Sequence, residues 1–189
     1  GYMSGTGPSG TAIWVHATNH VPQTNESVNP DYRIDESDSF SIGPFNPGYY
    51  NVIAIDSSDT RGIILRSFPI DNRDLKTTVS RTMEATGTIS GTLVSGHQSS
   101  YRKVFLTGTH FIESTDATGQ FSFINVPMGN YHLQSDTIIL WLSSEACSGE
   151  TIECEDQTFI TERKGDIDII VDLQSGELKD IGDIHEQVK

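Results

Sequence analysis

The histidines are the first residues that suggest chemistry, because imidazole can bind a metal ion or act as a base. His16 and His20 lie four positions apart in HATNH. This spacing places both rings on one face only if an extended strand continues past Asn19, and we expect the strand to end there. An internal repeat has Thr107 and Phe111 at the corresponding positions. We therefore expect surface or strand-end histidines, no metal site and no cofactor.

Two cysteines, Cys147 and Cys154, enclose the segment SGETIE, which contains a glycine turn signal. Such a pair can form a disulfide in an oxidising compartment or remain as two free thiols in a reducing one. Zinc is the weakest alternative, because the chain has no CxxC motif and no third thiol. The secreted-type composition of the rest of the chain favours the disulfide.

Carboxylates are abundant but not arranged for catalysis. In DIDIIVD, Asp166, Asp168 and Asp172 share one strand face, as in a half-solvated strand. The other face carries Ile167, Ile169 and Val171. No DxDxDG loop is present, although calcium on loop carboxylates stays open as an alternative. We find neither a glycosidase-like acid pair beside aromatic residues nor a GxSxG nucleophile motif. We expect no catalytic residues, and thus not an enzyme.

Aromatic side chains are the remaining candidates for binding. Trp14 and Phe105 occupy equivalent positions of the repeat, on the strand face away from the valine and leucine side. Trp141 in TIILWLS is a third candidate. Large rings on a sheet face can stack on sugars, cover a domain interface or lie half-buried beneath a loop.

The segments that contain the candidate residues belong to a sequence pattern that occurs twice in the chain. Phe40 and Phe121 are 81 positions apart, as are Tyr50 and Tyr131, in SDSFSIGPFNPGYYNV and TDATGQFSFINVPMGNYHL. Upstream, SGTGPSGTAIWVHAT matches SGHQSSYRKVFLTGT with a spacing of 91, which pairs Ser4 with Ser95. The first copy therefore carries ten extra residues, in a polar loop near residues 19–39.

The repeat predicts two domains, residues 1–84 and 85–189. Both copies end in two β-rich runs around a polar turn, which we interpret as a hairpin. The join near Glu84 has no flexible spacer, so the two domains are expected to hold a preferred mutual orientation.

The local patterns are those of strands and turns. AIWVHAT and KVFLTGT alternate with a period of two, and no segment shows a helical period with caps. In the second copy, residues 116–119 form a tight turn, Phe121 and Phe123 fill a core, and residues 127–129 turn the chain into a neighbouring strand at 131–133. These patterns predict an all-β chain of two tandem antiparallel β-sandwich domains.

The motif order GTISGTLVSG, VFLTGT and TDATGQFSFINVPMGNYHL, within residues 87–133, resembles the carboxypeptidase regulatory-like family. This family is a prealbumin-like (transthyretin-like), Greek-key β-sandwich appended to many secreted and surface bacterial proteins. The resemblance implies about seven strands per domain and no catalytic residues. The first copy departs from the pattern, since Asp38 replaces the turn glycine Gly119 and the first strand is shortened to YMSG.

Charge and composition limit the partners. The net charge of −14 repels phosphate backbones and anionic membranes, and no window reaches the length of a membrane span, so we expect neither nucleic acid nor membrane insertion. The first residues, GYMSGTG, lack the regions of a signal peptide.

We expect a non-catalytic structural or interaction module of a secreted or cell-envelope bacterial protein, which positions neighbouring domains of the same chain or binds a surface partner. Two alternatives stay open. One is a carbohydrate-binding module that uses exposed aromatic residues, and the other is an accessory domain of a larger secreted hydrolase.

Overall fold

Every regular element in the described part of the chain is a β-strand, as predicted. None of the described residues forms a helix long and apolar enough to cross a membrane. The computed structural model describes residues 1–22, 29–36, 38–71, 76–79, 81–94, 102–135, 138–142, 159–163 and 167–185, without the side chains of 76–79, 138–142 and 159–163.

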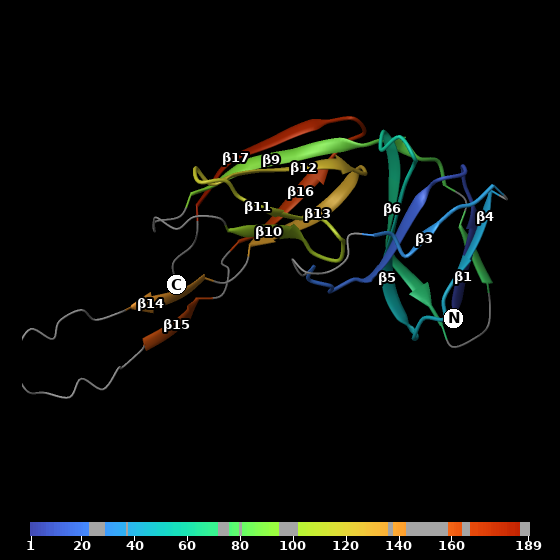
Figure 1. Ribbon diagram of the computed structural model, residues 1–189, viewed down its shortest axis with the longest axis horizontal. Coiled ribbons are helices and arrows are strands. Elements are labelled where there is room, and N and C mark those ends of the chain that lie inside the picture. Colours follow the sequence, from blue (N-terminus) through green and yellow to red (C-terminus); the bar gives the residue numbers. More distant parts are fainter. Residues whose placement is uncertain are drawn as a thin grey trace, which may run out of the picture.

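The first copy forms two sheets, one of three and one of five strands. The three-stranded sheet has the order β4-β1-β7 and the five-stranded sheet has the order β3-β2-β5-β6-β8 (Figure 1). The strands are β1 (Tyr2–Thr6), β2 (Ala12–Ala17), β3 (Tyr32–Arg33), β4 (Ser39–Ile42), β5 (Gly48–Ile55), β6 (Arg61–Ile70), β7 (Lys76–Val79) and β8 (Glu84–Ala85).

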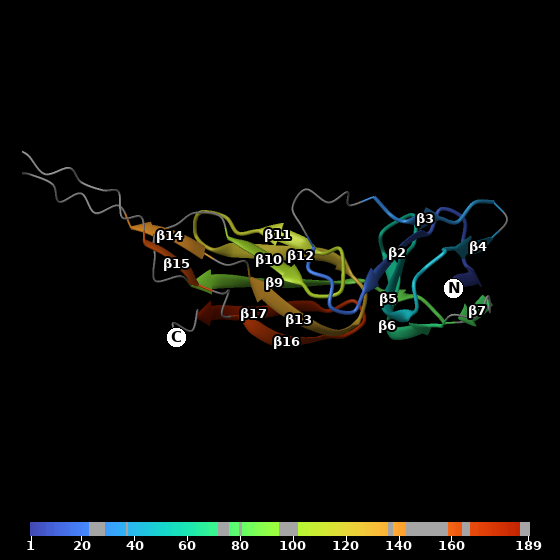
Figure 2. The same cartoon turned by 90° about the horizontal axis from the view of Figure 1, so that it is seen from below.

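The second copy repeats this architecture. Its sheets have the orders β12-β9-β17 and β11-β10-β13-β16, and a separate hairpin, β14-β15, projects beyond them (Figures 1 and 2). The strands are β9 (Gly87–Val94), β10 (Lys103–Leu106), β11 (Ile112–Ser114), β12 (Gln120–Val126), β13 (Gly129–Ser135), β14 (Ile138–Leu142), β15 (Phe159–Arg163), β16 (Asp168–Leu173) and β17 (Leu178–His185).

The two copies share one strand plan. The first strand, β1 or β9, pairs antiparallel with the phenylalanine strand, β4 or β12, and parallel with the last strand, β7 or β17. In the opposite sheet, β2 and β10 pair antiparallel with the tyrosine strands β5 and β13. All other pairings are antiparallel, so the prediction of tandem antiparallel β-sandwiches is confirmed.

Strand registers refine the alignment of the copies. Ile13 and Val104 occupy equivalent positions, which preserves the spacing of 91 on β2 and β10. The first strands differ from the prediction, because Gly5 faces Phe40 as Gly91 faces Phe121, a spacing of 86. Ser4 therefore corresponds to Ser90 and not to Ser95. The short SG motif occurs at both places in the second copy, and only strand pairing distinguishes them.

The predicted terminal hairpins are wrong. β6 and β7 lie in different sheets, and so do β16 and β17. In each copy the last strand pairs in parallel with the first strand, in the sheet opposite to the strand that precedes it in sequence. Two β-rich runs around a turn fit a hairpin and a sheet-to-sheet crossover equally well, so sequence pattern alone does not separate them.

An insertion separates β13 from β16 in the second copy. Gly48 faces Ile70 as Gly129 faces Leu173, so the spacing between copies rises from 81 to 103 across this region. The β14-β15 hairpin occupies part of the added length (Figure 1). Cys147 and Cys154 fall between these two strands, outside the described residues, so their disulfide stays a prediction.

Each copy has its own hydrophobic core. Met3, Ile13 and Val52 are buried in the first core. Phe121 and Phe123 are buried in the second, at 5% and 1% exposure, as the sequence predicted. β13 follows β12 in sequence but lies in the opposite sheet, not beside β12 as predicted. The buried side chains of β13 therefore contact Phe121 and Phe123 across the core.

The repeated tyrosine anchors the turn that precedes its strand. The Tyr131 hydroxyl donates to the carbonyl oxygen of Pro127 at 2.6 Å, and the Tyr50 hydroxyl donates to that of Asn46 at 2.9 Å. Both bonds span four residues, which is the arrangement of a tyrosine corner. The repeated sequence is therefore explained by the scaffold.

Removal of the Tyr131 hydroxyl tests this corner. Tyr131 is fully buried, so Tyr131→Phe leaves the Pro127 carbonyl without its donor and is expected to lower the free energy of unfolding by about 1–2 kcal/mol. The half-buried Tyr50 provides the matched control, because water can replace the lost bond in Tyr50→Phe. Urea denaturation measures both values, and an equal loss in the two variants would contradict the argument.

Candidate functional site

The outer face of the five-stranded sheet is buried against the second copy. Ile53 lies on this face by strand alternation, since Val52 points into the first core, yet its exposure is 0%. Ile64, its partner on β6, packs against the core of the second copy. We call this contact between the outer face of β2, β5 and β6 and the turns of the second copy the junction. It lies between the two groups of sheets in Figure 1.

Hydrogen bonds fix the junction at Gly108, in the turn between β10 and β11. The Gly108 N–H donates to the carbonyl oxygen of His20 at 2.6 Å, and the Asn51 side chain donates to the carbonyl oxygen of Gly108 at 2.9 Å. The other end of the Asn51 amide accepts from the N–H of Ser67 at 3.1 Å. Asn51 is 2% exposed, so these bonds are shielded from water.

Aromatic rings complete the junction. Trp14 stacks on His110 with ring centroids 4.1 Å apart, and His110 also contacts Phe111 at 4.3 Å. His16 and His20 stack at 4.6 Å, although the strand ends before His20 as predicted. The turn after Ala17, closed by the His20 N–H, brings the two rings together, which the expectation of separate surface histidines missed.

The histidines that the structure describes do not form a metal site. His16 lies 6.0 Å from His110 between ring centroids. In the described part of the chain, no group of three or more histidine, cysteine, aspartate or glutamate side chains is placed to hold a metal ion. Burial and, to a smaller extent, the charge of His16 together lower the pKa of His110 from 6.5 to about 3, so this ring is neutral near pH 7.

The neutral His110 predicts acid sensitivity. Because its pKa is depressed in the folded protein, protonation favours states in which His110 is exposed. Its contribution to stability is complete above about pH 6.5 and falls by up to about 1.4 kcal/mol per pH unit below that value. Between pH 6.5 and 5 we expect a loss of about 2 kcal/mol from this group.

His110→Phe is the matched variant, because it keeps a ring on Trp14 that cannot titrate. Urea denaturation of both proteins at pH 7 and pH 5 measures the difference. The wild type should lose more stability than the variant on acidification. The same loss in both would show that other groups cause the pH dependence.

A second part of the junction lies along β6. Gly62 approaches Pro127 so closely that a Cβ on Gly62 would lie 3.0 Å from the Pro127 ring. The Arg66 guanidinium lies over the Tyr131 ring, 4.6 Å from its centroid. Burial lowers the pKa of Arg66 and raises the pKa of Tyr131. Tyr131, which anchors a turn of the second copy, thus also contacts the Arg66 guanidinium of the first copy through its ring.

The aromatic candidates have different places in the structure. Trp14 is half-buried in the junction. Phe105 is 7% exposed, so neither ring offers an open platform. Trp141 pairs with Ile160 in the β14-β15 hairpin, but its side chain lies outside the described residues.

Asp168 and Asp172 are exposed on β16 and Val171 is buried, as the alternation predicted. Asp166 lies outside the described residues.

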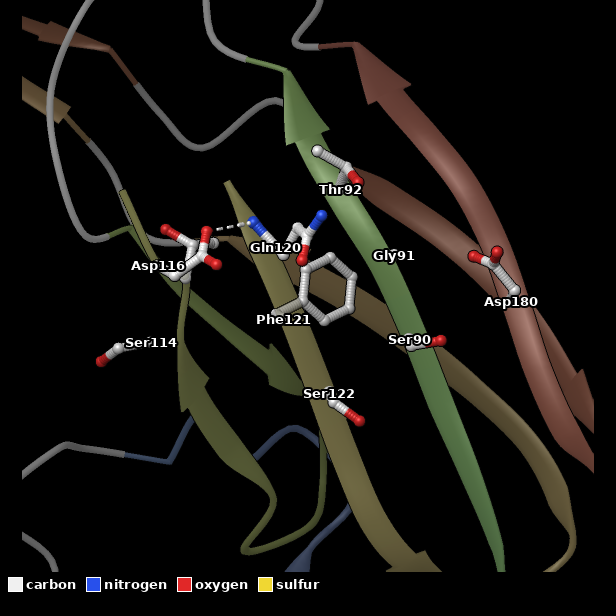
Figure 3. Close-up of a pocket in the computed structure, with 10 residues that line it drawn as sticks. Ser90, Gly91, Thr92, Ser114, Asp116, Gln120, Phe121, Ser122 and Asp180 are labelled. Carbon is white, nitrogen blue, oxygen red and sulfur yellow. Dashed lines mark hydrogen bonds between the residues drawn. The ribbon is translucent and has the colours of Figure 1, made fainter. Parts of the chain in front are cut away.

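A polar groove of about 710 Å³ lies on the sheet β12-β9-β17 (Figure 3). Hydroxyl groups and two carboxylates line it, including Ser90, Ser122 and Asp180. The Asp116 carboxylate is engaged by the turn, since it accepts from the Thr118 hydroxyl and two backbone N–H groups at 2.7–2.9 Å. These bonds lower its pKa. Asp116 thus acts as a turn residue, as its sequence context suggested.

Sequence reasoning missed Asn51, Gly108 and His110. The sequence nevertheless indicates the junction, because the two copies differ in residue type on the outer face of this sheet. Ile53 and Ile64 face each other on β5 and β6, where the second copy has Gln134 and Asp168. Apolar residues replace polar ones on the face that the second copy covers.

Comparisons with known proteins leave the family open. No protein-family model matches the sequence, and no curated protein matches it. Among solved structures, the chain is similar to the Bacillus anthracis TIE protein at 10% identity and a TM-score of 0.30. The match covers 99% of this chain and 34% of that chain, so this chain spans about a third of its length.

Proposed function

We propose that the chain is a non-catalytic structural module in which two β-sandwiches of the carboxypeptidase regulatory-like type form one rigid spacer. Its task is to hold neighbouring domains, or a bound partner, at a fixed distance and angle. A rigid spacer requires that its units do not rotate about their connection. The proposal therefore depends on the strength of the junction.

The observation that carries the proposal is the burial of polar groups between the copies. The Asn51 side chain donates to the Gly108 carbonyl oxygen, and the Gly108 N–H donates to the His20 carbonyl oxygen. Separation of the copies would break both bonds. The connection itself is short, because β8 ends at Ala85 and β9 begins at Gly87. The N–H of Thr86 between them donates to the carbonyl oxygen of Thr60 at 2.9 Å, which ties the link to the first copy.

NMR tests this rigidity directly. Residual dipolar couplings from the two copies should fit a single alignment tensor in the wild type. In the double variant Trp14→Ala/Asn51→Ala, which removes the ring stack and the amide bridge, the two copies should require separate tensors. Different tensors in the wild type would refute the rigid spacer.

The resemblance to the carboxypeptidase regulatory-like family and the tandem architecture support a place in a secreted or cell-envelope bacterial protein. Expression of the full-length gene product followed by cell fractionation tests this location. Trp14 and Phe105 are covered, so among the described side chains these two do not support a carbohydrate-binding role.

A further inference from the structure

β6 has an open edge. It pairs with β5 along its length, but β8 covers its other edge only at Arg61 and Gly62. No other strand in the described part of the chain pairs with residues 63–70. An uncovered edge strand presents backbone donors and acceptors that can accept an additional strand.

A groove follows this edge. Its volume is about 820 Å³, and its wall contains the consecutive residues 62–69 of β6. Arg81, Thr82, Glu84 and Met128 also line it. Met128 is 44% exposed, and three consecutive aliphatic residues of β6, at 63–65, are half-exposed. The groove thus combines an open backbone edge with apolar side chains.

Arg66 adds a positive charge in the middle of this strand. Its Nε and Nη2 atoms are buried and have no hydrogen-bond partner among the described residues. Buried donors of a charged group that lack an acceptor are costly, so a carboxylate close to Arg66 would be stabilised. Arg81 is exposed in the same groove, so two guanidinium groups and one carboxylate, that of Glu84, line it in a chain of net charge −14.

The corresponding strand of the second copy, β16, is protected against the addition of another strand by its charged side chains. β16 has a single partner, β13, among the described strands. It carries the exposed acids Asp168 and Asp172, and His132 lies 3.0 Å from the first of them. Charged side chains on an edge strand oppose the addition of another strand, particularly of an acidic one. β6 carries no acid and has Arg66 at its centre.

We propose that the groove along β6 binds an extended, acidic peptide segment of a partner protein, with its backbone paired to the open edge and a carboxylate held by Arg66 and Arg81. Backbone pairing supplies affinity, and the two arginines select an acidic side chain. This site goes beyond the spacer function, since a rigid pair of domains needs no ligand. Absence of peptide binding leaves the spacer proposal intact, whereas the site needs the docked copies, because Met128 of the second copy lines the groove.

Fluorescence anisotropy with defined peptides tests the site. The probe is a fluorescein-labelled peptide of alternating threonine and valine with one central glutamate. We expect saturable binding to the full chain below about 1 mM. Replacement of the central glutamate by glutamine should weaken binding about tenfold or more, without any change in the protein. N-methylation of alternate backbone nitrogens should abolish binding, because these residues cannot pair with a strand edge.

Protein variants locate the site. Arg66→Gln and Arg81→Gln should each weaken binding of the glutamate probe, whereas Arg33→Gln removes an exposed charge of the same copy and should change it less than about twofold. Hydrogen exchange should show new amide protection within residues 63–68 and none in β16. The proposal is overturned by absence of saturable binding, by equal effects of the three substitutions, by unchanged binding of the N-methylated probe, or by protection elsewhere.

Discussion

Gly108→Val is expected to separate the two copies while both remain folded. Gly108 has a φ of +74°, a conformation that a β-branched residue adopts only with strain. A Cβ at this position would clash with the Asn51 amide and lie 2.7 Å from the carbonyl oxygen of Thr18. The turn would have to move away from the first copy, and both hydrogen bonds of Gly108 across the junction would be lost.

The expected cost is about 3 kcal/mol or more, from about 1–2 kcal/mol of backbone strain together with two lost hydrogen bonds. This shifts the balance between docked and separated copies by more than about a hundredfold. Residual dipolar couplings should then require two alignment tensors, with chemical-shift changes concentrated around Asn51 and His20.

Gly182→Ala is the control for backbone strain alone. Gly182 has a φ of +68°, and a Cβ there would meet nothing within 4 Å. The substitution should lower the stability of the second copy by about 1 kcal/mol and leave a single alignment tensor. If Gly108→Val also keeps a single tensor, the junction does not depend on this turn.

Gly119→Ala should destabilise the second copy by about 3 kcal/mol, whereas Asp38→Gly at the equivalent position should stabilise the first by up to about 1 kcal/mol. Both residues have a positive φ, +84° at Gly119 and +54° at Asp38. A Cβ on Gly119 would also clash with the carbonyl oxygen of Leu93. Asp38 tolerates the same conformation, but glycine adopts it without a steric penalty.

The two turns are equivalent in their hydrogen bonds, which makes the comparison a matched one. Leu93 donates to the carbonyl oxygen of Gly119 at 2.8 Å, and Gly7 donates to that of Asp38 at 3.0 Å. Urea denaturation, with hydrogen exchange to assign each loss to one copy, measures both effects. Destabilisation by Asp38→Gly would show that the Asp38 side chain stabilises the turn by more than the strain of its positive φ destabilises it.

The prediction of the fold succeeded where local pattern and local structure coincide. The strands around Phe121 and Tyr131, and the turn at Gly119, follow from alternation and turn chemistry, which act within a few residues. The copy of this pattern 81 residues upstream predicted a second sandwich for the same reason. The ten-residue difference in spacing also agrees with the registers, which confine it to the segment before Tyr32.

The errors arose where partners are distant in the sequence. The match of Ser4 with Ser95 and the terminal hairpins both depended on which strands pair, and the parallel pairing of the first and last strands decides this. One further error was local: the stacking of His16 on His20 was missed because a turn, and not a continuous strand, brings the rings together.

Sequence by itself determined that this protein is built from β-strands, that one plan occurs twice, and which aromatic residues fill the second core. These properties depend on alternation and turn residues, which are local. Only the tertiary structure decided that Trp14, Asn51 and His110 meet at a junction and that β6 keeps an open edge. Both depend on how the two copies and their sheets are placed in space, and interactions between residues far apart in the chain determine that placement.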